Sequence, residues 1–402
     1  MPNAIGTGYI FLYVAMTALS LWIWRQETLS PRHILWIGMA LLICVLPLAP
    51  LTSNDSERYL WDGAVFLSGL DPYLTAPDAP AAADLRALWP TPEEHAAYPT
   101  LYPPIALSLF SLCALAGPVY GLWIWKGLVT LAALLSLALL YDLLRRRDAL
   151  KALPLMALSP LIIFETGVGH HLDIFCVLGL CAALWSLERE RIIWAGVIIG
   201  IAASIKFLPA LIAGPLIFYL MPRKAVKLFL AASLTWGAVY LLMFGLGYKP
   251  LGVLPTFFEK WRGGAPLYPL LESIQTALKL SSTQFLIMLG ALALSGFTLS
   301  ALMAKTGHIM AAIMLTLSVP LLLSPVLFPW YLMIFVPLLA LRPNMTLILA
   351  LPLGTLSYVV LDKWLGQGLW EPAAWPAILL LIGIIAGLVY DLIKLREMKP
   401  SN

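Results

Sequence analysis

Long apolar runs alternate with short polar segments along the whole chain, and each run reads as a helix. A helix rises about 1.5 Å per residue, so a hydrocarbon core of about 30 Å takes roughly 20 apolar residues to cross. Most of the runs approach this length. They cover residues 5–24, 34–51, 119–144, 152–168, 172–187, 192–220, 228–246, 284–304, 309–323, 330–341, 344–361 and 373–391.

The number of runs predicts a protein that crosses a membrane many times. If residues 192–220 form a broken hairpin of two helices, the chain has about 11 to 13 membrane-spanning helices. Composition agrees, because 61% of the 402 residues are hydrophobic and 11% are charged, and the mean hydropathy of +0.89 is outside the range of soluble domains. We therefore expect an all-α, polytopic integral membrane protein with one transmembrane domain over residues 1–402 and no separate soluble domain.

The distribution of positive charge predicts the orientation. Short cytoplasmic loops are rich in Lys and Arg, whereas translocated loops are poor in them. Residues 145–151, 223–227 and 394–399 are basic, which predicts that all three lie in the cytoplasm. Residues 52–102 carry eight acidic residues and only two arginines, so this segment is predicted to be an extracytoplasmic loop.

Residues 103–116 form an apolar run that does not fit this topology as a span, because it would move the basic residues 145–151 to the wrong side. A helix of this length is only about 21 Å long, shorter than the hydrocarbon core. We therefore expect a juxtamembrane or re-entrant helix here.

The start of the extracytoplasmic loop holds the strongest candidate for catalysis. With Ser53 or Asn54 as N-cap, a helix that begins at Asp55 carries four polar residues at positions i, i+3, i+4 and i+7 of one face. They are Asp55, Arg58, Tyr59 and Asp62. The helix dipole favours the ionised form of Asp55, as needed in a carboxylate that accepts a proton from an alcohol. The alternative is an ordinary surface helix with an ion pair between Asp55 and Arg58.

Other polar residues interrupt the apolar runs close to the same side of the membrane. An ionisable group at membrane depth is costly and is usually functional. Lys206 is the clearest case, because its run (192–220) is otherwise apolar; the alternative is a lysine that snorkels from a helix end beside Pro209. The predicted topology brings the following residues near the same surface: Tyr102, Lys126, His170, His171 and Asp173.

Six motifs follow one another along the chain. They are DSERYLWDG at 55–63, GLDPY at 69–73, PTLYPP at 99–104, GHHLD at 169–173, SIKFLP at 204–209 and SPVLFPWYL at 324–332. This series resembles the integral-membrane glycosyltransferases of the GT-C superfamily, and in particular the bacterial mannosyltransferases that use polyprenyl-phosphate-mannose. The resemblance implies a GT-C-like fold with juxtamembrane helices in the first large extracytoplasmic loop.

The resemblance also implies an activity. We expect an inverting glycosyltransferase that moves a sugar, with mannose favoured, from a polyprenyl-phosphate-linked donor to a lipid or glycan acceptor on the periplasmic face of a bacterial inner membrane. Asp55 is the expected general base, and Asp62 is the alternative. The residues expected to bind the substrates are Arg58, Tyr59, Asp62, Tyr102, Lys126, His170, His171, Asp173 and Lys206.

No metal or other cofactor is expected for this reaction. Cationic side chains can neutralise the leaving phosphate; the candidates are Lys206, Arg58, Lys126 and the pair Lys260 and Arg262. His170 and His171 do not form a convincing metal site, because adjacent residues of a helix point to different faces.

A transporter or flippase of lipid-linked sugars is the alternative function, with the broken segment 192–220 and Lys206 as a midplane site. Transporters of this kind often contain internal repeats, and none is evident between the halves of this chain. A nucleic-acid partner is not expected, because the net charge of +4 arises from the basic inner loops. The expected partners are therefore the lipid-linked donor, the acceptor and membrane lipids.

Overall fold

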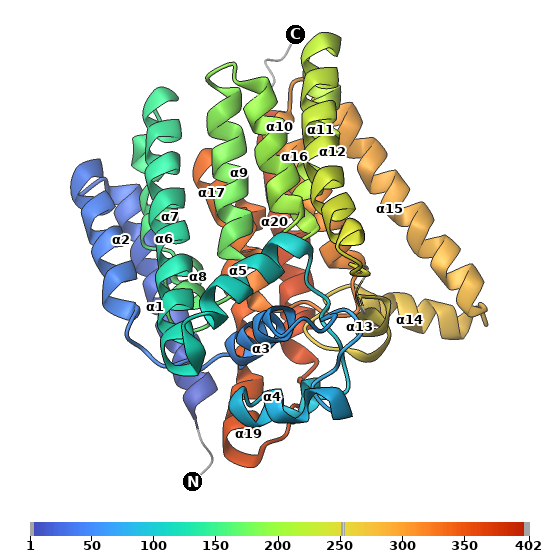
Figure 1. The fold of residues 1–402 in the computed structure, drawn as a ribbon. Coiled ribbons are helices and arrows are strands. Elements are labelled where there is room, and N and C mark those ends of the chain that lie inside the picture. Colours follow the sequence, from blue (N-terminus) through green and yellow to red (C-terminus); the bar gives the residue numbers. More distant parts are fainter. Residues whose placement is uncertain (1–3, 251, 253, 398–402) are drawn as a thin grey trace. The chain divides into compact units, whose positions relative to one another are not determined.

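A computed structural model describes residues 4–250, 252 and 254–397, and in that part of the chain every regular element is a helix (Figure 1). The prediction of an all-α, polytopic membrane protein is confirmed. The chain divides into two compact units, each made of segments that are separated in the sequence. The first unit comprises Met1–Gly38, Leu144–Ile162 and Trp261–Asn402, and the second comprises Met39–Leu143 and Ile163–Lys260.

The first unit contains nine α-helices and three 3₁₀ turns among the described residues. The α-helices are α1 (Ile5–Gln26), α7 (Pro154–Ala157), α14 (Tyr268–Ala277), α15 (Ser282–Lys305), α16 (Ile309–Leu323), α17 (Phe335–Leu341), α18 (Met345–Gly354), α19 (Val360–Gln367) and α20 (Trp375–Glu397). The 3₁₀ turns are η3 (Leu150–Ala152), η5 (Pro329–Ile334) and η6 (Thr355–Val359). Helix α15 packs against α16, and α18 packs against α20.

Two carboxylates of the first unit cap the beginnings of neighbouring helices. Asp362 of α19 accepts hydrogen bonds from the backbone N–H of Gly6 (2.7 Å) and the hydroxyl of Thr7 (2.7 Å) in α1. Asp391 of α20 accepts one from the N–H of Met345 (2.8 Å) at the start of α18. The first N–H groups of a helix lack partners within the helix and attract negative charge, so these contacts tie together helices that are far apart in the sequence.

The second unit contains α3 (Asp55–Leu67), α4 (Ala83–Leu88), α5 (Pro104–Ala114), α9 (Ile174–Leu187), α10 (Ile192–Ala203), α11 (Ala213–Tyr219), α12 (Pro222–Gly245) and α13 (Leu254–Lys260). Its 3₁₀ turns are η1 (Pro80–Ala82), η2 (Glu93–His95) and η4 (Leu208–Ile212). Three further helices cross the boundaries between the units: α2 (Pro31–Val45), α6 (Gly117–Arg146) and α8 (Pro160–Gly167).

Helices α9, α10 and α12 of the second unit pack side by side (Figure 1). Gly196 and Gly200, one turn apart on α10, face α12 so closely that an added Cβ would lie 2.5 Å from the carbonyl oxygen of Leu228 and 2.6 Å from that of Ala232. Small residues at this spacing let two helix backbones approach each other within a membrane. The glycines thus fix how α10 and α12 meet.

Among the residues that the structure describes, seven segments have the length and composition of membrane spans: Ile5–Gln26, Gly117–Arg146, Leu150–Gly167, Pro222–Gly245, Ser282–Lys305, Met345–Gln367 and Trp375–Glu397. Seven more apolar helices are shorter: Pro31–Val45, Pro104–Ala114, Ile174–Leu187, Ile192–Ala203, Leu208–Tyr219, Ile309–Leu323 and Pro329–Leu341. The predicted runs therefore form apolar helices, and the total of 11 to 13 spans stays a prediction because half of these helices are shorter than the roughly 20 residues that a span needs.

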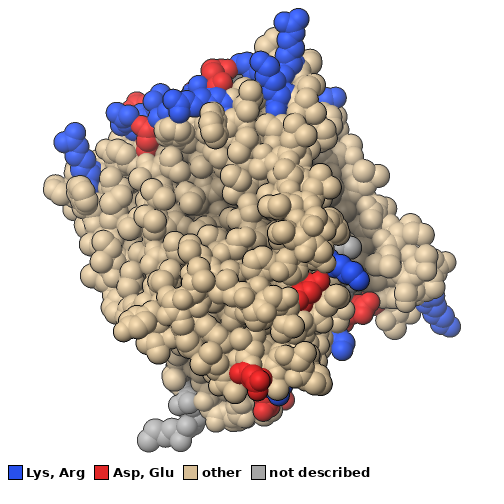
Figure 2. Space-filling model, in the orientation of Figure 1, with Lys and Arg blue, Asp and Glu red and all other residues tan. Residues whose placement is uncertain are grey.

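The sides of the long helices carry large apolar residues in contact with the surroundings. Leu241 of α12 is 71% exposed and Leu294 of α15 is 67% exposed. Most of the face visible in Figure 2 has no Lys, Arg, Asp or Glu. Contiguous apolar surface of this extent is unfavourable in water and is suited to contact with lipid chains.

The short run at 103–116 forms a separate helix, α5, of 11 residues. In Figure 1 the helices α3 and α5 lie beyond the lower ends of α9 and α10 and do not run alongside them. The N–H of Ile105, in the first turn of α5, donates a 2.9 Å hydrogen bond to the carbonyl oxygen of Ser204, directly after α10. Two prolines, Pro103 and Pro104, precede this bond and fix the entry of the chain into α5.

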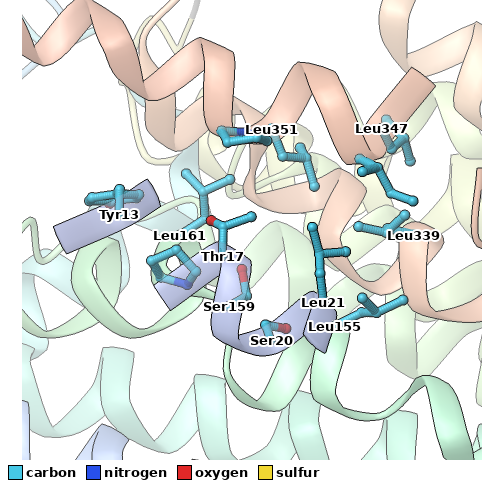
Figure 3. A pocket seen from close by; sticks show the side chains of 13 residues that line it. Tyr13, Thr17, Ser20, Leu21, Leu155, Ser159, Leu161, Leu339, Leu347 and Leu351 are labelled. Carbon is cyan, nitrogen blue, oxygen red and sulfur yellow. The ribbon is translucent and has the colours of Figure 1, made fainter. Parts of the chain in front are cut away.

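The first unit encloses a cavity of about 30 Å³ between α1, the α7 region, α17 and α18 (Figure 3). Leucine, isoleucine and proline side chains line most of it, together with the hydroxyl-bearing Tyr13, Thr17, Ser20 and Ser159. Ser20 donates a 2.7 Å hydrogen bond to the carbonyl oxygen of Pro154. The lining has no carboxylate, amine or imidazole, so this cavity provides no group for acid–base chemistry.

Gly63 provides a test of the contact between α3 and α5. A Cβ at this position would lie 2.4 Å from the backbone carbonyl carbon of Phe110, which cannot move aside as a side chain could. We expect Gly63→Ala to push α5 away and to lower the free energy of unfolding by about 1–3 kcal/mol. Gly127→Ala in α6 is the matched control, because nothing lies within 4 Å of its added Cβ. Thermal unfolding in detergent measures both, and equal stability of the two variants would contradict the expectation.

Candidate active site

Helix α3 begins at Asp55, as predicted, and its first turn shows which neighbour caps it. Asn54 occupies the N-cap position, but its side chain donates to Glu94 (2.7 Å) and does not cap the helix. The hydroxyl of Ser53 instead accepts a hydrogen bond from the N–H of Asp55 (3.2 Å). Of the two predicted caps, Ser53 therefore contacts the helix start.

The polar face of α3 points into the protein. Arg58, Tyr59 and Asp62 are 6%, 2% and 1% exposed, whereas the side chain of Asp55 is 22% exposed. Arg58 pairs with Asp62 at 2.9 Å, and the hydroxyl of Tyr59 donates to Asp55 Oδ2 at 3.3 Å. The alternative of a surface helix with an Asp55–Arg58 pair is therefore wrong, because the arginine is enclosed and its charge needs the equally enclosed Asp62.

Behind Asp55 lie an imidazole and a second carboxylate. Nδ1 of His171 lies 3.5 Å from Asp55 Oδ2, and Nε2 of the same ring lies 3.4 Å from Oε2 of Glu165. The side chains of His171 and Glu165 are completely buried. Asp55 thus forms the accessible end of a row of three ionisable groups that come from α3, the loop after α8, and α8 itself.

These surroundings determine the charge of Asp55. Burial, the largest single cause, raises the pKa of this carboxyl, but the contact with His171, its charge and the charges of His95 and Lys206 together outweigh burial. The pKa of Asp55 consequently lies below its ordinary value of 3.8. The carboxylate is ionised near neutral pH, as a general base must be.

The second carboxylate of α3 has a different environment. Arg58 donates to Oδ1 of Asp62, and Thr100 donates to its Oδ2 at 2.7 Å. Arg58 also donates to the carbonyl oxygen of His95 at 3.1 Å. Burial raises the pKa of Asp62, although Arg58 and Thr100 oppose the shift. The Arg58–Asp62 pair therefore connects α3 to His95 and Thr100, which lie later in the loop.

An ion pair between Asp173 and Lys206 lies next to these groups. Lys206 Nζ is 2.6 Å from Asp173 Oδ1, and the lysine side chain is 26% exposed while the aspartate is 7% exposed. Asp173 precedes α9, and Lys206 lies in the turn after α10. Lys206 helps to lower the pKa of Asp55, so the pair belongs to the same group of charges.

Aromatic rings support this part of α3. The ring of Tyr59 stacks on Phe110 at 4.6 Å and meets Tyr102 and Trp125 edge to face, both at 5.2 Å. Edge-to-face and offset pairs of this kind stabilise beyond the area that they bury. The rings fix the Tyr59 hydroxyl beside Asp55. They also bring Tyr102, a predicted substrate-binding residue, to the same place.

Two predicted substrate-binding residues are engaged with backbone groups. The Nε2–H of His170 donates to the carbonyl oxygen of Gly167 (3.0 Å), and its own carbonyl oxygen accepts from Trp125 (2.9 Å). Lys126 donates to the carbonyl oxygen of Leu48 (2.8 Å). Both residues are almost completely buried. Their role in substrate binding stays a prediction, and the structure gives each of them a contact that supports the fold.

Three residues near Asp55 were not among the predicted site residues: Glu165, His95 and Thr100. Glu165 interrupts the apolar run 152–168, and the cost of an ionisable group at membrane depth is a signal that could have identified it. His95 and Thr100 lie in a polar loop where such residues are common, so nothing in the sequence distinguishes them. Arg58 is the opposite case, since its guanidinium was predicted to face a phosphate and is instead paired with Asp62.

The fold and the site together define a polytopic, all-helical membrane protein in which carboxylates and cations meet beside one short helix, α3. Residues 3–223, more than half of the chain, match the MptA_B family, described as alpha-(1->6)-mannopyranosyltransferase, N-terminal domain. The chain belongs to this family and is a glycosyltransferase of the mannosyltransferase type, which confirms the resemblance seen in the motifs. Comparisons with curated proteins and with solved structures give no match.

The Arg58–Asp62 pair provides a test of how the loop is held. Removal of one partner leaves the other charge buried without compensation, so Arg58→Met should lower the free energy of unfolding by about 3–5 kcal/mol. The double variant Arg58→Met/Asp62→Leu removes both charges of the pair, so its free energy of unfolding should fall by less than that of the single variant. Denaturant or thermal unfolding of the purified proteins measures this difference, and a double variant less stable than Arg58→Met would contradict it.

Proposed function

We propose that the protein transfers mannose, with inversion, from a polyprenyl-phosphate-linked donor to a lipid or glycan acceptor at the extracytoplasmic face of a bacterial inner membrane, with Asp55 as general base. The observation that carries the proposal is the arrangement around Asp55. An ionised, partly exposed carboxylate lies in one group of charges with the ammonium of Lys206. Transfer of a sugar from a phosphate needs a base for the acceptor and a cation for the leaving group.

Accessibility favours Asp55 over Asp62 as the base. The Asp55 side chain is 22% exposed, and both of its contacts given above, with Tyr59 and His171, are made by Oδ2. The Asp62 side chain is 2% exposed, and each of its oxygens already accepts a hydrogen bond. A base must come within hydrogen-bond distance of the hydroxyl that it deprotonates. Oδ1 of Asp55 is the oxygen that we assign to this contact.

Lys206 is the residue that we assign to the leaving phosphate. Its side chain is 26% exposed, whereas Arg58 and Lys126, two other predicted phosphate-binding cations, are 6% and 4% exposed. Asp173 fixes the ammonium in place at 2.6 Å. A phosphate that approaches this pair would add a second anion to the lysine, in a site where neighbouring protein keeps the local dielectric constant low.

The proposed step balances as follows. The oxygen of the acceptor hydroxyl forms a bond to the anomeric carbon of mannose, and its proton moves to Oδ1 of Asp55. The bond between the anomeric carbon and the phosphate oxygen breaks, and its electron pair stays on the polyprenyl phosphate beside Lys206. If the product carries the alpha-(1->6) linkage of the family description, inversion requires a β-linked donor and a 6-hydroxyl as the nucleophile.

The distribution of charge along the second unit supports the proposed membrane face. Asp173 and Lys206 lie at one end of α9 and α10, and Arg189 and Arg191 lie in the turn that joins the other ends of these two helices. A helix of 14 residues such as α9 separates its ends by about 21 Å. Basic turns remain in the cytoplasm. We therefore place the charged residues around Asp55 toward the extracytoplasmic side of the membrane.

The remaining predicted residues take supporting roles in this proposal. Tyr59 donates a hydrogen bond to Asp55, and Tyr102 packs against the ring of Tyr59. Arg58 and Asp62 hold the loop, and His170 and Lys126 hold the backbone around it. Family membership favours sugar transfer over transport, and nothing in the described residues favours a transporter or flippase.

The base is tested by transfer of radiolabelled mannose from polyprenyl-phosphate-mannose to acceptors in a membrane extract. We expect Asp55→Asn to lower the transfer rate by about 10²–10⁴-fold, because the carboxamide cannot accept the proton. Asp62→Asn, at matched abundance and thermal stability, should retain more activity. Wild-type turnover by Asp55→Asn would exclude it as the base. Absence of transfer with every donor, accompanied by flux of the lipid-linked sugar across vesicles, would favour transport.

The leaving-group cation is tested separately. Lys206→Gln removes the charge that we assign to the phosphate and should lower kcat by about 10²–10³-fold, the usual cost of losing one group that stabilises developing negative charge. Lys224→Gln is the matched control, because Lys224 forms an exposed ion pair with Glu190 at the other end of α10. Its kcat should remain within about twofold of wild type. Equal kcat in both variants would remove Lys206 from this role.

A further inference from the structure

Glu165 and His171 form a buried pair directly behind Asp55. Both side chains are completely enclosed, whereas Asp55 reaches the surface. The imidazole lies between two carboxylates, with Nδ1 toward Asp55 Oδ2 (3.5 Å) and Nε2 toward Glu165 Oε2 (3.4 Å). Hydrogen bonds of catalytic groups are often this long before substrate binds and shorten in the reacting complex.

The backbone around the pair is shaped to hold the ring in this position. The N–H of His171 donates to the carbonyl oxygen of Glu165 (3.0 Å), so the chain turns back on the end of α8. His170 has a φ of 53°, a left-handed conformation that costs energy for a residue with a side chain. A Cβ on Gly169 would lie 2.3 Å from Cδ2 and 2.6 Å from Nε2 of the His171 ring. Only glycine leaves room for the imidazole here.

The chemistry of the pair follows from its burial. An enclosed carboxylate such as Glu165 is stable only beside a cation or several hydrogen-bond donors. The imidazole of His171 is the group placed to meet this need, because each of its ring nitrogens faces one of the flanking carboxylates. Neither buried residue can touch a sugar without leaving its enclosure, so their effect on the substrate must pass through Asp55.

We propose that Glu165 and His171 are positioning residues that hold Asp55 by its Oδ2, so that Oδ1 faces the acceptor hydroxyl as a carboxylate. This inference rests on the proposed role of Asp55 as the base. Glu165 holds the imidazole at Nε2, and the imidazole holds the Asp55 carboxylate in one rotamer at Nδ1. After each transfer Asp55 releases its proton from Oδ1 to water at its exposed edge.

The electrostatics of Asp55 support this assignment. Its pKa lies below the ordinary value although burial raises it, and the contact and charge of His171 are the largest of the causes that lower it. The other groups that act on Asp55 are His95, in η2, and Lys206, in the turn after α10. Tyr59 donates to it from α3 itself. Loss of the contact with His171 would remove a cause that lowers the pKa of Asp55, so the effect of burial would be less opposed and this pKa would rise.

The test is the pH dependence of mannose transfer by Glu165→Gln, which keeps the shape of the side chain and removes its charge. We expect kcat to fall about tenfold or more, with the KM for the donor within about twofold of wild type, because the base is affected and the donor site is not. The acid limb of the kcat/KM profile should move up by roughly one pH unit or more. The matched control is Glu190→Gln, an exposed residue on a distant turn, which should give the wild-type profile.

Gly169→Ala gives a second measurement that removes no ionisable group. Its methyl group displaces the imidazole, so we expect the same loss of kcat and the same movement of the acid limb as in Glu165→Gln. Thermal unfolding identifies any variant that does not fold, and should Glu165→Gln not fold, His171→Gln and Gly169→Ala decide the question by the same readouts. A purely structural role would lower stability without moving the acid limb.

The outcomes separate this inference from the proposed function. If Asp55→Asn is inactive and the folded variants of Glu165, His171 and Gly169 keep the wild-type acid limb, the positioning role is wrong and Asp55 remains the base. If Asp55→Asn is fully active, the proposed function fails first and the inference fails with it. Loss of kcat without movement of the acid limb also overturns the inference.

Discussion

A charge enclosed among apolar side chains must be paired, and this requirement determines how the second unit is built around α3. Two pairs and one group of three satisfy it: Arg58 with Asp62, Lys206 with Asp173, and His171 between Glu165 and Asp55. A buried charge without a partner costs several kcal/mol, so the segments that carry these residues are held together by their charges as well as by packing. The loop, the end of α8 and the turn after α10 therefore meet at one place.

Close backbone contacts complete this arrangement. Gly63 brings α3 against the backbone of α5, and Gly196 and Gly200 bring α10 against α12. In lipid, apolar surface gives little drive for helices to associate, so contact area and polar pairs have to supply it. The glycines and the ion pairs therefore play complementary parts. The glycines permit close approach of the helix backbones, and the ion pairs determine which loops lie together at the helix ends.

For a member of a mannosyltransferase family, the same requirement gives the site its chemistry. Asp55 and Lys206 are the partly exposed members of pairs whose other members, His171 and Asp173, are enclosed. Each buried partner holds an accessible charge in a defined position. In their proposed roles as base and phosphate-binding ammonium, Asp55 and Lys206 are fixed before substrate arrives and need little rearrangement during the reaction, which is how preorganised charges lower a reaction barrier.

Apolar length, charge and helical spacing are local properties, so the helices, the polar loop at 52–102 and the face of α3 follow from the sequence alone. The sequence also identified Asp55, His171 and Lys206 as unusual, since each lies in a motif or an apolar run where its presence is costly. The pairing of the charges depends on how the helices pack. Arg58 contacts Asp62 and not Asp55, and Glu165 gains its importance from a histidine that a left-handed turn brings back toward it. Such contacts depend on distances between segments that the chain separates by up to a hundred residues or more, and those distances are fixed only when the helices pack.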